Sequence, residues 1–394
     1  MQVSNAELKK INLVSHYFKR AYENDSKVVY VNALIPAEVL IALGVVPFNL
    51  GSVGGIFAQG RASTKLINLA QQNHFSGDLC STSRCIMGAA FKNAMPTPDY
   101  LILSSGPCDV DSHLIHTLSL LYEKKWFPLD VPLYYDDREE AISYMESQIR
   151  QLVADMEKTL NLRLEPEKLR EAVEYSNETI SYVQKTSELS KLIPSPVSVV
   201  ETIDIVSSLH LLGSKEMAEV FKEKYEELQG KARDKKFQGQ RKPRVLWRGL
   251  RPYYTNEIFD HLENNCNVEV ISEMDIYGSS SYEGWELLNP DEPYRSLAKR
   301  MLLLSSNYCT ANRQFTRHIP LKMDEYSIDG VIAFNSRGCR HIVSLNQVIR
   351  SIINENNRPF LELDCDYIDD RDYAFEQIKT RIEAFTELLN GRMQ

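Results

Sequence analysis

DYLILSSGPC, residues 99–108, and DGVIAFNSRGC, residues 329–339, are two versions of one pattern. Each version has an aspartate, a short apolar run and a glycine-containing turn that ends in a cysteine. A short apolar run bounded by turn residues is typical of a buried strand. After each cysteine come a helical stretch, a second short strand and a related motif, YYDDR at 134–138 and YIDDR at 367–371. A unit that occurs twice in this order predicts two similar domains.

The sequence around both copies predicts their fold class. Short apolar runs at 27–32 and 45–50 flank a helical pattern at 37–43, and a similar alternation begins again at 244–247. Strands that alternate with helices indicate an α/β fold with a parallel sheet. We therefore predict two similar Rossmann-like (flavodoxin-like) α/β lobes. Because such sheets bind ligands beyond the carboxyl ends of their strands, Cys108 and Cys339 are expected to lie across one cleft.

The stretch between the two copies has a different character. Residues 138–236 are mostly helix-forming and highly charged, and residues 216–228 place apolar side chains at helical spacing. This pattern predicts a helical insert. The predicted domains are 1–137, an N-terminal α/β domain with Cys80 and Cys108; 138–236, a helical domain; and 237–394, a C-terminal α/β domain with Cys339.

Composition limits the class of protein. The 394 residues carry a formal net charge of −9, which argues against a partner that is a nucleic acid or an anionic membrane. The polar start has no apolar signal region. No run reaches the roughly 18 apolar residues that a membrane span needs. We expect a cytoplasmic protein without a membrane partner.

Three of the seven cysteines form a candidate metal site. Cys80 is at the predicted start of a helix, where Ser81 or Ser83 can cap the helix and the helix N-terminus stabilises a thiolate. With Cys108 and Cys339 it makes three thiols without an obvious fourth ligand, which fits a four-iron cluster with one open iron. The alternative is that each thiol is a small buried side chain, the usual fate of a free cysteine.

Several motifs together resemble a known family. Three segments resemble the three cluster motifs of the 2-hydroxyacyl-CoA dehydratases and benzoyl-CoA reductases. They are the run from Cys80 to Arg84, the pair Pro98-Asp99 with Cys108-Asp109, and Asp329–Ile332 with Cys339. The resemblance covers nearly the whole chain. Further matching segments are Ile35–Val39, Ala42–Gly44, Val245–Gly249 and Lys379–Phe385.

The resemblance implies a function and partners. It implies that Cys80, Cys108 and Cys339 ligate a 4Fe–4S cluster that passes one electron to a CoA thioester, giving a ketyl-like radical in a dehydratase. It also implies a dimer with a homologous subunit or with a second copy. The chain has no P-loop, so ATP-driven activation is expected from a separate iron–sulfur activator.

One departure leaves alternatives open. Where catalytic subunits of these dehydratases have a Pro-Glu-Asn-His stretch, this chain has Phe48-Asn49-Leu50-Gly51-Ser52. The chain is then a companion subunit, or a benzoyl-CoA reductase-type or double-cubane-type reductase subunit. It could also be a cluster-holding electron-transfer or maturation protein, or a metal-free α/β binding protein.

Other residues carry narrower expectations. The catalytic residues are not identified by the sequence, and Glu38, Arg84 and His113 are the candidates. Arg248 and Arg251, between a strand and a helix, are candidate contacts for CoA phosphates or else solvated loop arginines. The glycine-rich residues 51–55 are expected to form a turn. Cys85 and Cys309 could join a larger cluster, whereas Cys266 and Cys365 are expected to be structural.

Overall fold

The protein consists of two α/β lobes joined by long helices. This computed structural model describes residues 4–32, 34–106, 108–132, 139–234, 241–280, 284–308 and 313–393. Each lobe has a four-stranded sheet, with the order β2-β1-β3-β4 in one and β6-β5-β7-β8 in the other, and all pairs are parallel. This confirms the predicted fold class. The strands are β1 (Val28–Val31), β2 (Val46–Asn49), β3 (Tyr100–Ser104), β4 (Trp126–Leu129), β5 (Arg244–Arg248), β6 (Glu269–Ser272), β7 (Gly330–Ser336) and β8 (Phe360–Cys365).

The repeated aspartate has the same structural role in both lobes. A side-chain oxygen of Asp99, just before β3, accepts a hydrogen bond of 2.8 Å from the backbone N–H of Val28 at the start of β1. Asp329, just before β7, accepts one of 2.8 Å from the N–H of Arg244 at the start of β5. Each aspartate thereby fixes the start of the neighbouring strand, which explains why the repeat begins with this residue.

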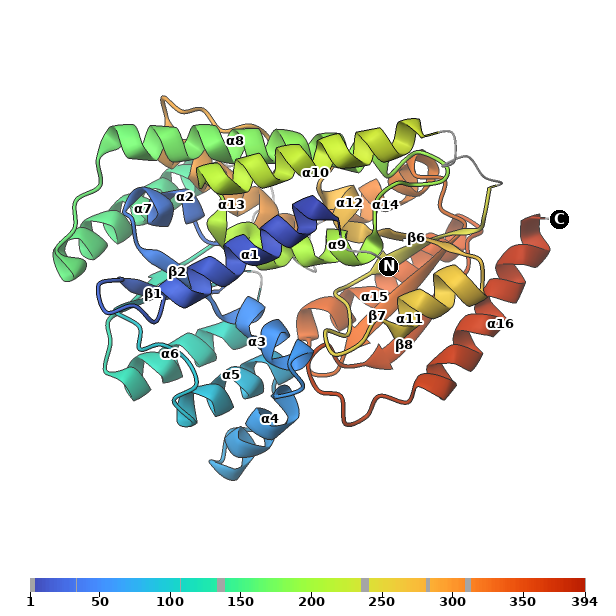
Figure 1. Cartoon of the computed structure of the whole chain (residues 1–394), viewed down its shortest axis with the longest axis horizontal. Coiled ribbons are helices and arrows are strands. Elements are labelled where there is room, and N and C mark those ends of the chain that lie inside the picture. Colours follow the sequence, from blue (N-terminus) through green and yellow to red (C-terminus); the bar gives the residue numbers. More distant parts are fainter. Residues whose placement is uncertain are drawn as a thin grey trace.

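Helices cover both sheets (Figure 1). In the N-terminal lobe they are α1 (Asn5–Arg20), α2 (Ala37–Ala42), α3 (Leu50–Gln59), α4 (Ser63–Gln72), α5 (Ser81–Phe91) and α6 (Val110–Tyr122). In the C-terminal lobe they are α11 (Glu257–Asp260), η3 (His261–Asn265), α12 (Glu273–Tyr277), α14 (Arg313–Glu325), α15 (Arg340–Glu355) and α16 (Phe375–Met393). The helix α13 (Pro293–Tyr308) precedes α14 in the chain but packs against α7 and the core of the N-terminal lobe. Among the residues with described structure, no helix combines the length and the apolar character that crossing a membrane requires.

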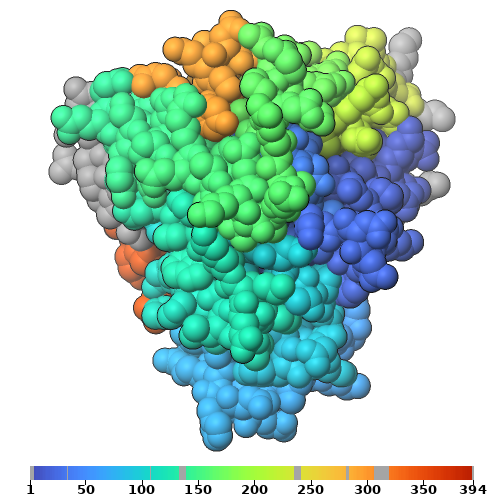
Figure 2. Space-filling view, turned by 90° about the vertical axis from the view of Figure 1, so that its left-hand side faces the viewer, coloured from blue at the N-terminus to red at the C-terminus, as the bar shows by residue number. Residues whose placement is uncertain are grey.

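The segment between the lobes is helical, as the sequence predicts. Its helices are α7 (Glu139–Leu160), α8 (Pro166–Leu189), α9 (Val199–Ile203), η1 (Asp204–Leu211) and α10 (Lys215–Arg233). The long helices α8 and α10 run along one side of the molecule above both lobes in Figure 1, and α1 lies beside α10. Seen from the side, α7 and α8 form a continuous surface above the N-terminal lobe, with the α4 region at the opposite end (Figure 2). The exact domain boundaries stay a prediction.

The expectation of a turn at residues 51–55 is wrong, because these residues belong to α3. The side chain of Asn49 accepts a hydrogen bond of 3.0 Å from the N–H of Ser52 and caps the helix. The glycines are needed for close packing. A Cβ on Gly54 would be 2.8 Å from the side chain of Thr82.

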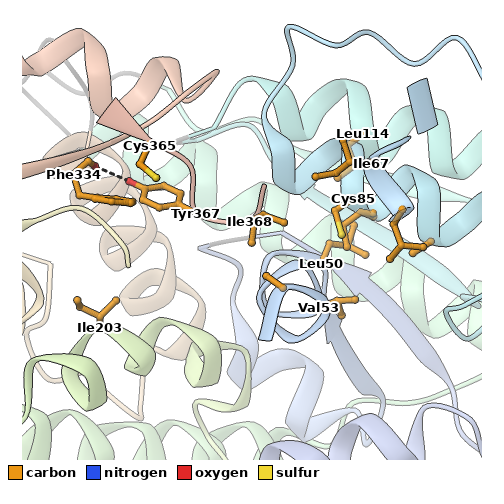
Figure 3. Close-up of a cluster of buried hydrophobic side chains, with 14 of the residues drawn as sticks. Leu50, Val53, Ile67, Cys85, Leu114, Ile203, Phe334, Cys365, Tyr367 and Ile368 are labelled. Atoms are coloured by element: carbon orange, nitrogen blue, oxygen red, sulfur yellow. Dashed lines mark hydrogen bonds between the residues drawn. The ribbon is translucent and has the colours of Figure 1, made fainter. Parts of the chain in front are cut away.

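The lobes are fixed to each other by the loop after β8. Ser81 donates a hydrogen bond to Asp366, and Ser63 donates one of 2.8 Å to the carbonyl oxygen of Ile368. A buried apolar cluster continues across the same junction and includes Leu50 of one lobe and Phe334 of the other (Figure 3). The relative position of the lobes is therefore set by buried contacts.

Candidate functional site

The three predicted cysteines lie at the starts of three helices. Cys80 is the residue before α5, and Cys339 is the residue before α15. Cys108 precedes Asp109, the residue before α6. Cys108 and Cys339 each follow the carboxyl end of a central strand, β3 or β7. The repeat therefore places two thiols at equivalent ends of the two sheets, as predicted.

The backbone brings the cysteines of the two lobes together. Gly338 has a φ of +77°, and a Cβ on it would be 3.2 Å from both the nitrogen of Cys80 and the carbonyl oxygen of Leu79. Only glycine combines this backbone conformation with such a close approach at low cost. The turn before Cys339 therefore lies directly against the start of α5.

Burial raises the pKa of all three thiols. Burial, followed by the charge of Cys339, raises the pKa of Cys80 to about 11. Burial is also the main cause that raises the pKa of Cys108, and Cys80 and Cys339 add to it. The pKa of Cys339 is raised by burial as well. Free thiols in this setting keep their protons at neutral pH, whereas a bound metal removes the proton from a coordinating thiol.

Backbone N–H groups lower the pKa of each of the three thiols against the effect of burial. Those of Thr82 and Ser83 act on Cys80, and those of His341 and Ile342 act on Cys339. That of Asp111 acts on Cys108. These interactions favour the thiolate. The expected side-chain cap of α5 is not formed, since no side chain caps this helix and the Ser81 hydroxyl bonds to Asp366 instead.

The described side chains can be searched for a site that would hold a single metal ion. Within the described parts of the chain, no three His, Cys, Asp or Glu side chains are placed to hold a single metal ion. A polynuclear cluster keeps its thiolate ligands further apart than one ion does. The 4Fe–4S cluster expected at Cys80, Cys108 and Cys339 stays a prediction.

A cavity of about 680 Å³ opens beside the cysteines. Cys108 and Cys339 line it, together with Thr82 of α5. Ile11 of α1 and Ile56 of α3 also line it and are 47% and 45% exposed, so the mouth lies between these two helices. The volume is within the range of about 300–1,000 Å³ for small-molecule sites.

Arg248 and Arg251 line the cavity but are not solvated. Arg248 is buried and lies 2.8 Å from Glu273. Arg251 makes two hydrogen bonds of 2.8 Å to the carboxylate of Asp204. Both guanidinium groups therefore have a carboxylate partner, and binding a phosphate would compete with it. Their predicted role in binding CoA phosphates stays a prediction.

Glu38 is completely buried beside the cavity. One of its oxygens accepts hydrogen bonds from Arg300 of α13 and Ser176 of α8, and its other oxygen has no hydrogen-bond partner among the described residues. Arg300 lines the cavity, whereas Glu38 lies behind it. Glu38 therefore holds the guanidinium of Arg300 in place, and a role of Glu38 in the chemistry stays a prediction.

The other two catalytic candidates do not line the cavity. Arg84 is buried, donates a hydrogen bond of 2.9 Å to the carbonyl of Leu79 and lies 3.7 Å from Asp369. It supports the backbone just before Cys80. His113 is exposed on α6. Roles for both in the chemistry stay predictions.

The remaining cysteines have separate surroundings. Cys85 lies among apolar side chains that include Leu50 and Ile67, and Cys365 lies near Phe334 (Figure 3). The sulfur of Cys365 is 3.2 Å from the hydroxyl of Tyr254. Cys266 ends η3, 3.4 Å from a ring nitrogen of His261. Cys309 is outside the described residues.

Several residues around the cavity carry no sequence signal of function. They belong to no motif and come from distant segments, so only the fold brings them together. They are Lys10, Asp111, Asp204, His210, Glu273 and Arg300. Asp111 is one example: burial raises its pKa to about 6, and Asn32 donates a hydrogen bond of 3.2 Å to it.

Comparisons with known proteins cover the two lobes and the insert. A family model described as 2-hydroxyglutaryl-CoA dehydratase, D-component, matches residues 32–389. The lactoyl-CoA dehydratase subunit alpha of Anaerotignum propionicum is 23% identical over 390 residues, which are 92% of this chain and 90% of that protein. The (R)-phenyllactyl-CoA dehydratase alpha subunit of Clostridium sporogenes is 21% identical, over 95% of this chain and 92% of that protein. The (R)-2-hydroxyisocaproyl-CoA dehydratase alpha subunit of Clostridioides difficile is 22% identical with the same coverage.

Proposed function

Because the chain belongs to the 2-hydroxyglutaryl-CoA dehydratase D-component family, we propose that it is a subunit of a 2-hydroxyacyl-CoA dehydratase. The reaction removes the hydroxyl group and a proton from neighbouring carbons of a CoA thioester and releases water. The observation that supports this most is that Cys108 and Cys339, one from each lobe, line one cavity, while the turn before Cys339 lies against the backbone of Cys80.

Cys80, Cys108 and Cys339 are the proposed ligands of a 4Fe–4S cluster. When bound by these three cysteines, such a cluster would supply one electron to the thioester. The chain contributes the backbone N–H groups at three helix starts, which stabilise the thiolates. It also contributes the cavity walls, which exclude water from the reacting group.

Arg300 is the proposed contact for the polar end of the acyl group. It is buried and lines the cavity, and Glu38 and Ser176 hold its guanidinium. A guanidinium fixed in this way positions a carbonyl oxygen without a large entropy cost. This contact does not determine which acyl group the substrate carries.

The proposed enzyme has further components. The relatives above are named alpha subunits, which implies other subunits. We infer a homologous subunit or a second copy as the partner, and a separate ATP-dependent iron–sulfur activator. Neither partner is a nucleic acid or a membrane.

A cluster-holding electron-transfer protein is the second candidate. Asn49, in the segment that replaces the Pro-Glu-Asn-His stretch, lines the cavity with an amide, and this amide is engaged in capping α3. No carboxylate is available at this position. Turnover of a 2-hydroxyacyl-CoA by the assembled complex distinguishes the two candidates.

Anaerobic reconstitution tests the cluster assignment. The wild-type chain is expected to bind about four irons per chain, the content of one cubane. Cys80→Ala, Cys108→Ala and Cys339→Ala are each expected to lose the cluster, as measured by iron, sulfide and the visible spectrum. Cys266→Ala, at a partly exposed cysteine that is expected to be structural, is the matched control. Full iron retention in any of the three variants removes that cysteine from the ligand set.

A further inference from the structure

The repeated motif at 367–371 has a role that the cavity does not explain. Its last three residues, Asp369, Asp370 and Arg371, follow β8 in the C-terminal lobe. Each of them contacts α4, α5 or the residues just before α4, all of which belong to the N-terminal lobe. We call residues 369–371 the DDR segment.

Two side chains of the DDR segment bind α4 and its start. One carboxylate oxygen of Asp370 accepts a hydrogen bond of 3.1 Å from Arg61, just before α4, and the other accepts one of 2.5 Å from Thr64. Arg371 donates a hydrogen bond of 2.8 Å to the side chain of Asn68, one turn further along α4. These bonds fix the position of α4 relative to the C-terminal lobe.

The helices α4 and α5 pack so closely that they form one unit. They lie side by side in the N-terminal lobe (Figure 1). Gly88 of α5 lies against the backbone of α4, since a Cβ on it would be 1.9 Å from the carbonyl oxygen of Leu66. Close-packed elements of this kind transmit a displacement to each other. A contact that fixes α4 therefore also limits the movement of α5, which begins directly after Cys80.

The third side chain of the DDR segment, Asp369, is linked to the start of α5 through Arg84. Arg84 is 6% exposed, and its carboxylate partner is Asp369, at 3.7 Å. The Nε of Arg84 donates a hydrogen bond of 2.9 Å to the carbonyl oxygen of Leu79. Asp369 in turn accepts a hydrogen bond of 2.8 Å from Arg371. The position of the Arg84 guanidinium is therefore set by the C-terminal lobe.

The peptide bond between Leu79 and Cys80 is held by these contacts. Its carbonyl oxygen belongs to Leu79 and accepts the hydrogen bond from Arg84, and its nitrogen belongs to Cys80. The turn at Gly338 lies against the same peptide, because a Cβ on Gly338 would be 3.2 Å from both of these atoms. Rotation of this peptide would move the Cα and the sulfur of Cys80. Its fixed orientation therefore determines where the sulfur points.

From these contacts we infer that Arg84 and the DDR segment are positioning residues for Cys80. Arg84 acts through the backbone, by holding the peptide before the Cα of Cys80, and the DDR segment holds both Arg84 and α4. The opposite reading is that Arg84 acts through its charge, as a counter-ion for a thiolate. The inference rests on the proposed function, because it concerns a proposed cluster ligand.

Thiol labelling of the full metal-free chain distinguishes position from charge. The probe is iodoacetamide, and peptide mass spectrometry gives the rate at each cysteine. Arg84→Met and Asp369→Asn both loosen the same peptide. Each is expected to label Cys80 roughly tenfold faster than wild type, the change in population from one lost charge-assisted hydrogen bond.

The arginine variant gives the decisive sign. Iodoacetamide reacts with the thiolate, and a nearby cation favours the thiolate. If Arg84 acts through its charge, Arg84→Met labels Cys80 more slowly than wild type, and this result would overturn the inference.

A second cysteine and a matched variant serve as controls. Cys85, next to Arg84 on α5 and fully buried, reports opening of the whole helix. Labelling of Cys85 in parallel with Cys80 would mean that the variants unfold, and the inference would fail. Asp372→Asn makes the same change at an aspartate whose side chain is 68% exposed and pairs with Arg337 of its own lobe. It should leave the rate at Cys80 unchanged.

A milder variant covers the case in which the buried ion pair is needed for folding. Asn68→Ala removes the contact of Arg371 with α4 at an exposed position. It is expected to raise the labelling rate of Cys80 roughly two- to threefold, because an exposed hydrogen bond contributes little, while Cys85 stays protected. A rate equal to that of wild type would refute the link through α4.

The outcomes separate this inference from the proposed function. If Arg84→Met and Asp369→Asn label Cys80 at the wild-type rate, the inference fails while Cys80 can still be a cluster ligand. If both label Cys80 faster but Cys80→Ala retains its full iron content after reconstitution, the inference about position stands and the proposed ligand role fails.

Discussion

Ser81 donates a buried hydrogen bond to Asp366, and this bond joins the residue after Cys80 to the loop after β8 in the opposite lobe. The same Asp366 oxygen accepts backbone hydrogen bonds of 2.9 Å from Ile368 and 3.0 Å from Asp369. One carboxylate thus orders its own loop and holds the start of α5. The distance between cysteines of the two lobes depends on this contact.

Ser81→Ala is expected to destabilise the fold by about 1.5–3 kcal/mol, the range for a hydrogen bond to a charged group. It leaves Asp366 buried with fewer partners. Chemical denaturation measures the loss, and iron release to a chelator is expected to become faster. Ser351→Ala, at an exposed helical serine, is the control and should change stability by less than about 0.5 kcal/mol. Unchanged iron release in Ser81→Ala would contradict the link between this contact and the thiols.

Gly338→Ala is expected to disturb the cysteine site directly. A left-handed backbone costs a non-glycine residue about 1–3 kcal/mol, and the added Cβ would press on the backbone of Cys80. The variant should bind less iron at a given iron concentration. Gly230→Ala, in α10 with open space around it, is the matched control and should stabilise the fold by about 0.5–1 kcal/mol. Normal iron affinity in Gly338→Ala would show that the turn can adjust.

Glu38→Gln tests the positioning of Arg300. The variant removes the negative charge from a buried pair, and such a change typically costs about 3–5 kcal/mol. The double variant Glu38→Gln with Arg300→Met is expected to be less destabilised than the sum of the single variants. Thermal and denaturant unfolding of the four proteins measure this coupling. Full stability with complete loss of turnover would instead identify Glu38 as a catalytic residue.

Cys266→Ser and Cys365→Ser are expected to keep the full iron content and visible spectrum. Cys365 is buried beside Tyr254, and Cys266 lies beside His261, so both have local partners. The Cys365 variant should lose some stability, because a hydroxyl replaces a buried thiol. A partial loss of iron in either variant would favour a double-cubane cluster.

A dimer, homo- or hetero-, is the expected assembly. Apolar side chains are exposed on the two helices that follow Cys108 and Cys339: Leu120 on α6 is 68% exposed and Val348 on α15 is 48% exposed. Sedimentation of the reconstituted chain, alone and with a homologous subunit, measures the oligomeric state. A strictly monomeric chain that still turns over a CoA thioester would contradict this expectation and place the electron path within one chain.

The sequence predicts the sheets well because their strands are apolar and bounded by turns. The strand predicted at 100–104 is observed as Tyr100–Ser104, and the internal repeat corresponds to two sheets of the same order. Prediction from local sequence alone is wrong at residues 51–55. Glycines there indicate a turn, but they lie in α3, where Gly54 packs against Thr82, a contact between distant segments.

The site could be predicted only where residues belong to motifs. The three cysteines are found in this way, and the fold brings their helices together. His210 and Arg300 lie in segments without a motif, on η1 and α13, and become neighbours of the cavity through the insert and the docking of the lobes. The sequence also could not show that Arg248 and Arg251 are paired with carboxylates. Their partners Glu273 and Asp204 become neighbours only in the folded chain.

Because the three thiols come from two different lobes, the order of steps in biosynthesis is restricted. Cys80 and Cys108 leave the ribosome long before Cys339, and the turn at Gly338 must be docked on Leu79 before all three sulfurs are neighbours. A group held by all three therefore cannot be inserted while the chain is being translated. For the proposed cluster, this predicts that the finished polypeptide folds first, with its thiols protonated, and that the cluster is delivered in a late, post-translational step.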